Sequence, residues 1–493
     1  MVKEYKTLLK NYFSQHSFVE SNINSFDYFL DKQLQGLVDE VGEIVPTIIP
    51  QEVENFMIKL GKISVGTPEI TEADGSRRDI FPTETRLRDL TYAAPITLEV
   101  SSVINGVTNE SFVAYLGKMP VMLKSKHCHL HGLKNDDLTK QGEDSNDSGG
   151  YFILNGNERA LIMVEDLASN KFFVKKATIG TSKFVGKLYS EKTSYRIPHT
   201  LEQTKDGIIS LSFTRFKRVP VVALIKALGI TSDQEIMQSI SKDTFDDVLI
   251  NLYDNIELKT QDDALDFIAK KIGITQKEIR VERVREYLDK YLLPHLGIEK
   301  KDRIVKAQNL AKMVKRFLLV STGKISSLDQ DHYSNKRLKL SGDLLMDLFR
   351  VNLRSLVQDI LYNFQRLVKR GKFTSLKIII REQLLSSRVH SAMATGSWVG
   401  GRAGISQNMQ RTNRIDTLSH LQRVVSLLTS SQENFDARAL HSTHWGRLCP
   451  VETPEGTPIG LRKNLAILAN ITRVEPTEEK VKSLLVGAGV KLS

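Results

Sequence analysis

The sequence predicts a multi-domain α+β protein, and three observations lead to this prediction. The chain has 493 residues, more than the roughly 250 to 300 at which a single hydrophobic core stops growing. Residues 62–123 alternate apolar and polar side chains around turn-forming dipeptides, which is typical of β-strands. Residues 341–370 repeat apolar side chains at helical spacing. We therefore expect both sheets and helices, distributed over three or four compact units.

The N-terminal part predicts a helix followed by hairpins. Val2 to Leu34 carry apolar residues at helical spacing. Asp74-Gly75 and Asn105-Gly106 then mark hairpin turns, and Asn155-Gly156 marks another. Between them, Lys134 to Gly150 are acidic and rich in turn formers, which favours a surface loop.

The middle of the chain changes in composition. After the strand-like pieces that begin near Lys171, four short apolar-periodic stretches between residues 234 and 292 predict short helices. This shift indicates a second domain over roughly residues 175–340. The longest amphipathic pattern follows at Ser341 to Arg370, with Ser341 or Asp343 as the expected N-cap and Gly371 as the end.

The composition narrows the functional classes. Hydrophobic residues make up 41% and charged residues 26% of the chain, as in ordinary globular proteins. The most apolar stretch, Val219 to Ile230, is interrupted by Lys226, so no membrane segment is expected. Two cysteines, Cys128 and Cys449, cannot form a disulfide framework, which favours a cytoplasmic location. The formal charge of +11 favours a polyanionic partner.

Much of the functional interest lies in Ser386 to Val425, which we name the arginine segment. It contains no lysine and one acid, Asp416. A guanidinium group matches two phosphate oxygens at once, so this composition favours nucleic-acid contact. A solvated basic helix beside a loop is the alternative. The arginines are Arg388, Arg402, Arg411, Arg414 and Arg423.

Two histidine-rich stretches raise the question of a metal. His441, His444 and Cys449 offer three ligands, and His127, Cys128, His129 and His131 form a second group in which a strand would place the histidines on one face. Zinc sites normally show paired cysteines, which both stretches lack. We expect no metal site in the chain. Nucleophile elbows, phosphate loops and carboxylate clusters suited to two magnesium ions are also missing from the sequence.

Glu452 and Glu455 lie in a stiff stretch, VETPEGTPIG, in which proline recurs every four residues. Such a loop, flanked by Arg447, Arg462 and Lys463, can position nucleotides. It can equally be a structural turn whose glutamates cap nearby amides. The pattern alone leaves both interpretations open.

The same residues carry a family resemblance. HSTHWGRLCPVETPEGTPIGLRKNLA, His441 to Ala466, resembles the signature of the second-largest, beta-like subunit of multisubunit DNA-dependent RNA polymerases. AMATGSW, RAGISQNMQ and LSHLQR precede it in the family's order, and YFILNGNERALI extends the similarity upstream. The family subunit is normally much longer. The chain therefore resembles its N-terminal half, which in the split archaeal form is a separate polypeptide called B double-prime, with B prime as its complement.

The resemblance implies a domain division. Residues 1–175 and 341–395 would form the protrusion, residues 176–340 the lobe, residues 396–470 the fork, and residues 471–493 the start of the external domain. The two fork loops would lie near Ala394 to Gly404 and at Ser426 to Arg438.

The resemblance also implies residue roles. Glu452, supported by Glu455, would lie near the incoming nucleotide. The catalytic aspartates that hold Mg²⁺ would belong to the largest subunit, so this chain would bind no cofactor itself. The expected nucleic-acid contacts are Arg402, Arg411, Arg414, Arg423, Arg438 and Arg447.

The implied function is transcription of DNA into RNA from ribonucleoside triphosphates, as a part that is inactive alone. The chain would form one side of the DNA cleft and part of the active-site wall, and would help to separate the strands. Its partners would be B prime, the largest subunit, the other polymerase subunits, template DNA, the RNA–DNA hybrid and general transcription factors. The alternative is a non-catalytic basic protein that binds nucleic acid through the arginine segment alone.

Overall fold

The computed structural model describes residues 2–50, 53–109, 111–177, 182–192, 195–240, 245–274, 279–371, 375–428, 434–471 and 478–490. It divides into two compact units. The first unit comprises residues 1–166 and 338–493, and the second comprises residues 167–337. Helices and sheets occur in both, which confirms the predicted α+β class. The domain names implied by the resemblance stay predictions, and the expected boundary at residue 175 falls inside strand β11 (Phe172–Lys176).

The first unit is built on an antiparallel sheet in the order β1-β2-β5-β6, with β7 also paired to β5. Asn105 and Gly106 join β5 to β6 with positive φ angles of 48° and 82°, which suits a two-residue hairpin turn. The predicted turns at Gly75, between β3 and β4, and at Gly156, between β8 and β9, are confirmed as well. The strands are β1 (Glu43–Ile44), β2 (Phe56–Val65), β3 (Glu69–Thr71), β4 (Arg77–Asp79), β5 (Ala93–Ile104), β6 (Val107–Thr108), β7 (Phe112–Pro120), β8 (Phe152–Leu154) and β9 (Asn157–Leu161).

The N-terminal helix is interrupted, so the prediction of one helix over Val2 to Leu34 is wrong. The Ser17 hydroxyl accepts a hydrogen bond from Val19 N–H (3.4 Å) and the Ser17 carbonyl accepts one from Glu20 N–H (3.1 Å). Local bonds of this kind compete with the helical ladder. The helical pieces are α1 (Val2–Gln15), α2 (Glu20–Tyr28), a π-helical turn η1 (Phe29–Gln33) and α3 (Leu34–Val41).

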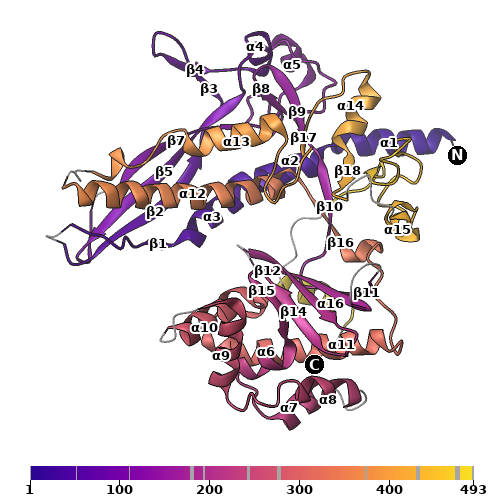
Figure 1. The fold of residues 1–493 in the computed structure, drawn as a ribbon. Coiled ribbons are helices and arrows are strands. Elements are labelled where there is room, and N and C mark those ends of the chain that lie inside the picture. Colours follow the sequence, from indigo (N-terminus) through magenta and orange to yellow (C-terminus); the bar gives the residue numbers. More distant parts are fainter. Residues whose placement is uncertain are drawn as a thin grey trace. The chain divides into compact units, whose positions relative to one another are not determined.

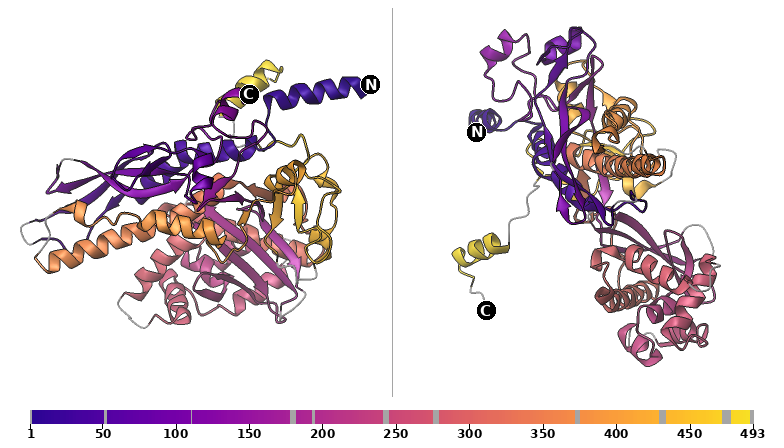
Figure 2. Two further views of the ribbon diagram at one scale, coloured as in Figure 1. Left: turned by 90° about the horizontal axis from the view of Figure 1, so that it is seen from above. Right: turned by 90° about the vertical axis from the view of Figure 1, so that its left-hand side faces the viewer.

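Helix α12 (Ser341–Lys369) runs alongside the sheet of the first unit (Figures 1 and 2). Its predicted span is confirmed, but the expected N-cap at Ser341 or Asp343 is wrong, because Leu340 occupies the N-cap position. The carboxylate of Asp343 accepts a hydrogen bond from Leu340 N–H (3.0 Å), and Gly371 follows its end at φ 64°. Gly342 packs so closely on α2 that a Cβ would lie 2.1 Å from the Ser25 carbonyl oxygen. Near the other end, Phe364 stacks on Phe56 of β2 at 4.7 Å between ring centroids.

Two smaller sheets complete the first unit and carry the arginine segment. One has the order β17-β9-β8, and in the other β18 pairs in parallel with β10 and antiparallel with β19. Lys134 to Gly150 are not simply a surface loop, because they form α5 and bury Leu138 and Glu143. The elements are α4 (Pro82–Leu87), α5 (Asn135–Lys140), β10 (Met163–Leu167), β16 (Lys336–Lys339), α13 (Leu384–Thr395), β17 (Ser406–Asn408), α14 (Arg414–Leu421), β18 (Arg423–Ser426), α15 (Phe435–Arg438), β19 (Arg462–Asn464) and α16 (Glu478–Gly487).

The second unit has one antiparallel sheet whose strands pair in sequence order from β11 to β15. The predicted short helices are confirmed, and the Thr260 side chain caps α9 by accepting from Asp263 N–H (3.2 Å). No helix of the described residues is long and apolar enough to cross a lipid bilayer. The elements are β11, β12 (Phe184–Lys192), β13 (Tyr195–Gln203), β14 (Ile209–Phe213), β15 (Phe216–Pro220), α6 (Val221–Ala227), α7 (Asp233–Ile240), α8 (Phe245–Tyr253), α9 (Gln261–Ile272), α10 (Arg280–Tyr291) and α11 (Arg303–Ser321).

Candidate nucleic-acid interface

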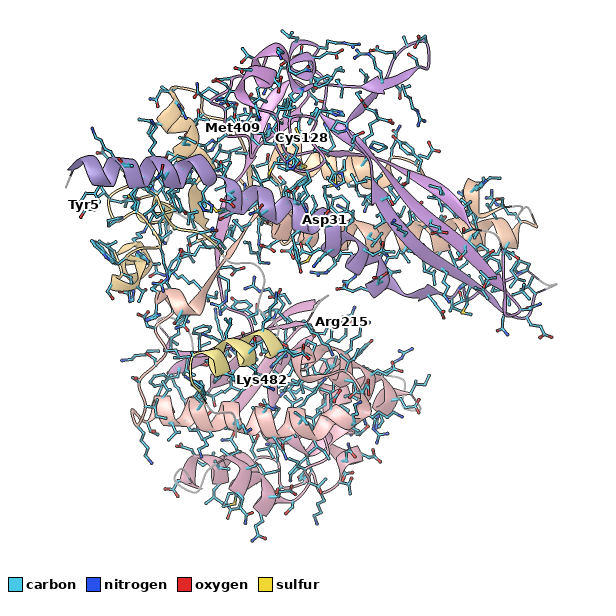
Figure 3. All side chains as sticks on the ribbon, turned by 180° about the vertical axis from the view of Figure 1, so that it is seen from behind. Tyr5, Asp31, Cys128, Arg215, Met409 and Lys482 are labelled. Atoms are coloured by element: carbon cyan, nitrogen blue, oxygen red, sulfur yellow. The ribbon has the colours of Figure 1, made fainter. Side chains whose placement is uncertain are left out.

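The arginine segment is fixed to the first unit through β17, which pairs antiparallel with β9. Met409, labelled in Figure 3, continues this pairing, since its N–H donates to the Glu158 carbonyl (3.0 Å). Backbone hydrogen bonds alone therefore fix the position of the segment that leads to Arg411.

Arg402 lies in the glycine-rich turn that precedes β17, and two carboxylates hold it. Its guanidinium group lies 3.2 Å from Asp166 and 3.8 Å from Asp347, and the side chain is only 19% exposed. The neighbouring Trp398 is buried and donates from Nε1 to the Leu344 carbonyl (2.9 Å). The role of Arg402 toward nucleic acid stays a prediction, and its observed partners are acids.

Arg411 is also bound to acidic partners. Its Nε donates to Glu158 Oε2 (2.7 Å) and its Nη2 to Asp147 Oδ2 (3.1 Å). The guanidinium plane lies over the Tyr151 ring, 4.9 Å from the centroid. A guanidinium group that lies over a ring and donates from two nitrogens to two different carboxylates suits arginine and would not suit lysine.

A second arginine, Arg86, closes this cluster from the other side. It donates to Glu158 Oε1 (2.9 Å), to both carboxylate oxygens of Glu143 (2.9 and 3.0 Å) and to the Tyr151 hydroxyl (2.9 Å). That hydroxyl donates to Asp147 Oδ2 (2.7 Å). We name the six residues the arginine–carboxylate network: Arg86, Glu143, Asp147, Tyr151, Glu158 and Arg411.

The pKa values in the network follow from its contacts. Burial alone would raise the pKa of Asp147, but hydrogen bonds from Gly149 N–H and the Tyr151 hydroxyl, with the charge of Arg411, lower it overall. Burial likewise opposes ionisation of Glu158, and its two arginines lower its pKa below the ordinary range. Both carboxylates are therefore ionised at neutral pH.

Arg414 stands in different surroundings, at the start of α14. It is exposed, and its Nη1 lies 3.5 Å from the amide oxygen of Asn146. Together with Glu452 it lines an open pocket of about 530 Å³, which we name the Glu452 pocket. The pocket is formed by Asn413, Arg414, Ile415, Asp416, Ser419 and Glu452.

Glu452 has a fixed position in this pocket. Its Oε1 accepts a hydrogen bond from the Ser419 hydroxyl. Asn464 of β19 donates to that hydroxyl (2.9 Å) and to the Ser419 carbonyl (2.8 Å), so the carboxylate has a supported partner. Glu455 is exposed, three residues further along the loop. The sequence indicated the glutamates but not Ser419 and Asn464, which are contributed by α14 and β19.

Arg423 lies beside the same pocket. Its Nη2 donates to the Gln410 side-chain oxygen (3.0 Å). Burial and the charge of Arg462 lower its pKa, while Asp416 and Glu452 oppose that shift. Basic and acidic side chains therefore lie within electrostatic reach of one another beside this pocket.

Arg438 holds the proline-rich loop through its guanidinium group. Its Nη1 donates to the carbonyl oxygens of Thr457 (2.7 Å) and Ile459 (2.9 Å). Gly460, at φ 72°, lies so close that a Cβ would be 2.3 Å from the Arg438 carbonyl oxygen. Arg447 is exposed and donates to the Thr443 carbonyl (3.1 Å). Of the expected second fork loop, residues 429–433 lie outside the described residues.

Histidine rings in both histidine-rich stretches make hydrogen-bonding contacts with nearby polar groups of the chain. His441 Nδ1 lies 2.7 Å from the Thr443 hydroxyl, and His444 is buried. His127 and His129 face the carbonyl oxygens of Gly66 (3.2 Å) and Pro68 (2.9 Å) from a series of turns, so placing them on a strand is wrong. In the described part of the chain no three His, Cys, Asp or Glu residues are arranged to hold a metal ion.

His420 supports the arginine segment from inside. It is buried, its Nδ1 accepts from Gln410 N–H (3.3 Å), and its Nε2 lies 3.2 Å from the Gln407 side-chain oxygen. Burial, with the charge of Arg423, lowers its pKa to about 4, so the ring is neutral at pH 7. The ring therefore acts as a packing and hydrogen-bonding residue.

A buried ion pair joins the strands below the Glu452 pocket, and the sequence did not reveal it. Lys463 Nζ of β19 lies 3.1 Å from Glu165 Oε1 of β10, with side chains 8% and 3% exposed. The pairing depends on two residues almost three hundred positions apart, which no local pattern connects.

Comparisons with known proteins show that most of the chain is similar to proteins of one family. A family model described as RNA polymerase beta subunit matches residues 17–387, and one described as RNA polymerase Rpb2, domain 3, matches residues 407–471. DNA-directed RNA polymerase subunit Rpo2N of Methanocaldococcus jannaschii is 41% identical over 499 residues, covering 99% of each chain. DNA-directed RNA polymerase subunit Rpo2 of Saccharolobus solfataricus is 41% identical over 496 residues. The chain spans only 43% of that longer relative.

Proposed function

Because the chain belongs to the RNA polymerase beta subunit family, we propose that it works as one part of a DNA-dependent RNA polymerase that makes RNA from ribonucleoside triphosphates. The observation that carries this proposal is the 41% identity to an Rpo2N subunit over 99% of both chains. The resemblance to the second-largest subunit is thereby confirmed. In the proposal the chain forms one side of the DNA cleft and is inactive alone.

The proposed protein partners are B prime, the largest subunit and the other polymerase subunits. Several large apolar side chains near the proline-rich loop in the sequence are exposed in the first unit. Exposed apolar surface favours a partner that covers it. Phe435 is 77% exposed, Trp445 80% and Val451 84%. In the proposal B prime covers them, while general transcription factors contact other surfaces.

The proposed nucleic-acid partners are template DNA and the RNA–DNA hybrid. Arg414 and Arg447 are exposed, and they donate to an amide oxygen and a backbone carbonyl. Neutral partners leave the guanidinium charge available to a phosphate. Arg423 and Arg438 would contribute beside them, whereas Arg402 and Arg411 would act mainly by fixing the backbone that presents Arg414.

Glu452 would act as a supporting residue near the incoming nucleotide. A carboxylate does not bind phosphate, but it accepts hydrogen bonds from hydroxyl groups, and Ser419 fixes its orientation. Asp416 and Glu452 are the carboxylates that line the pocket. The proposal leaves the catalytic Mg²⁺ with the largest subunit.

Reconstitution tests the proposal. The purified chain alone should not incorporate nucleotides on a DNA template, and activity should return when B prime and the other subunits are added. Native mass measurement of the complex isolated from cells should show a large assembly. Template-dependent synthesis by the isolated chain would contradict the proposal.

Isolation from cells also distinguishes the polymerase subunit from the alternative, a non-catalytic protein that binds nucleic acid. A non-catalytic basic protein would bind single strands unaided, with a steep salt dependence, and would be recovered from cells without other polymerase subunits. Recovery in that free form would favour the alternative over the polymerase.

A further inference from the structure

The second unit contains a pocket that the proposed polymerase function does not use. It has a volume of about 440 Å³ and is lined by side chains from β11, β12 and α11, with further residues from the segments that flank α11. Pockets of this size hold a few side chains or a small ligand. The lining therefore indicates what kind of partner would fit.

Two cationic side chains line the pocket from α11. Lys312 and Arg316 are exposed and lie four residues apart on α11, so they are on one face of the helix. Among the described residues neither makes a hydrogen bond or an ion pair. Their charges are free for an incoming group.

A third cation, Lys171, also lines the pocket. Its Nζ donates to the Ser334 carbonyl (3.1 Å) and to the Asn335 side-chain oxygen (3.2 Å). These neutral partners fix its position and leave its charge uncompensated. Three positive side chains thus face one cavity.

Acidic residues do not offset this charge. Of the described residues that line the pocket, none is Asp or Glu. In neighbouring segments Glu191 lies 3.8 Å from Arg196, and Asp331 lies 3.1 Å from Lys336. The cavity is therefore suited to an anionic ligand.

The floor of the pocket is apolar. Phe172, Leu188 and Met313 line it and are each less than 10% exposed. His295 lies beside them with its Nδ1 2.7 Å from the Ser190 hydroxyl, and burial lowers its pKa, so it adds no charge at neutral pH. Such a floor is suited to an aromatic or branched apolar side chain.

We propose that this pocket binds a short acidic segment of a partner protein, which places an apolar side chain on the floor and carboxylates against Lys312 and Arg316. The combination distinguishes this ligand from nucleic acid. A phosphate backbone needs a basic track, and the Phe172 ring, 8% exposed, is too buried to serve as a stacking surface for bases. The proposal concerns the second unit alone and does not depend on the polymerase function.

Binding of a defined peptide to the full chain tests this site. The probe is fluorescein-labelled Gly-Asp-Asp-Phe-Glu-Asp-Leu-Gly, followed by fluorescence anisotropy. Reversing both rim charges, with Lys312→Glu and Arg316→Glu together, should weaken binding about tenfold, because attraction becomes repulsion at two exposed positions. Lys315→Glu is the matched control, since Lys315 is exposed on the same helix and does not line the pocket. It should change binding less than about twofold.

Changing the ligand keeps the test independent of protein folding. The same peptide with serine in place of Phe and Leu keeps every charge and should bind the unaltered chain about tenfold more weakly, because it loses the buried apolar contacts. Equal binding of the two peptides would overturn the proposal. An equal effect of Lys315→Glu would also overturn it. Tighter binding of a single-stranded oligothymidine that is lost with the same double variant would assign the pocket to nucleic acid instead.

Discussion

The arginine–carboxylate network and the Glu452 pocket contain arginines only three residues apart, Arg411 and Arg414, in opposite surroundings. Arg411 binds Glu158 and Asp147 and stacks on Tyr151. Arg414 is exposed, and among the described residues its guanidinium group hydrogen-bonds only to the Asn146 amide oxygen, at 3.5 Å. The difference shows that an arginine-rich segment combines residues that hold the fold with residues that remain available to a ligand.

The largest effect on stability should come from Arg86→Ala. This change leaves Glu143, which is 9% exposed, without its bidentate partner, and removes one partner from Glu158. Leaving a buried carboxylate unpaired should cost about 3 kcal/mol in the free energy of unfolding. Guanidinium chloride unfolding of the full chain measures it.

Arg88→Ala is the matched control for that experiment. Arg88 lies two residues further on and pairs with Glu72 and Glu84, but these side chains are all substantially exposed. Its removal should leave the unfolding midpoint nearly unchanged. Equal destabilisation by the two substitutions would show that burial does not distinguish the pairs.

Arg411→Ala should cost less, about 2 kcal/mol, because its side chain is 40% exposed. Combined with Arg86→Ala it should cost about 1 kcal/mol more than the sum of the single changes, since only the double variant leaves Glu158 with neither arginine. Unfolding curves for the four proteins of this cycle measure the coupling. Simple additivity would mean that the two arginines do not share Glu158.

At acidic pH, the unaltered chain and the Arg411→Ala variant should differ less in stability than they do at neutral pH. The pKa values of Asp147 and Glu158 are lowered in the folded chain, so their stabilisation is complete above their ordinary values near 4 and is lost as the pH falls below them. The two unfolding midpoints should therefore converge below about pH 4. A constant difference down to pH 2 would contradict the ion pairs.

His420 should give a smaller effect in a different pH range. Its pKa of about 4 lies below the ordinary 6.5, so the neutral ring stabilises the fold above pH 6.5, and this stabilisation is lost as the pH falls toward 4. His420→Gln should flatten the stability curve of the first unit in that range, by at most about 1.4 kcal/mol per pH unit. Unchanged slopes in the variant would show that the ring is not buried neutral.

Patterns of local origin were predictable from the sequence. The span of α12, the hairpin turns at Asn105-Gly106 and Asn155-Gly156, and the short helices of the second unit follow from periodicity and turn chemistry, and the structure confirms them. The break in the N-terminal helix was missed because it depends on hydrogen bonds of Ser17 that compete with a continuous apolar pattern.

The sequence could not show which arginines pair with carboxylates and which stay exposed, because this depends on contacts between distant parts of the chain. Asp147 and Glu158 approach Arg411 across more than 250 positions, and Glu165 approaches Lys463 across almost three hundred. The acidic stretch around Asp147 resembled a surface loop for the same reason, since its partners are absent from its own sequence.

The distinction between Arg411, which holds the fold, and Arg414, which is available to a ligand, can be tested most directly in the reconstituted polymerase. The measurement is the salt dependence of its binding to the template–hybrid. Arg414→Ala should reduce the slope of log K against log salt by about one, because one phosphate contact is lost, while the unfolding midpoint of the chain stays unchanged. Arg411→Ala should lower that midpoint instead. An unchanged slope for Arg414→Ala, or a reduced slope for Arg411→Ala at full stability, would contradict the account.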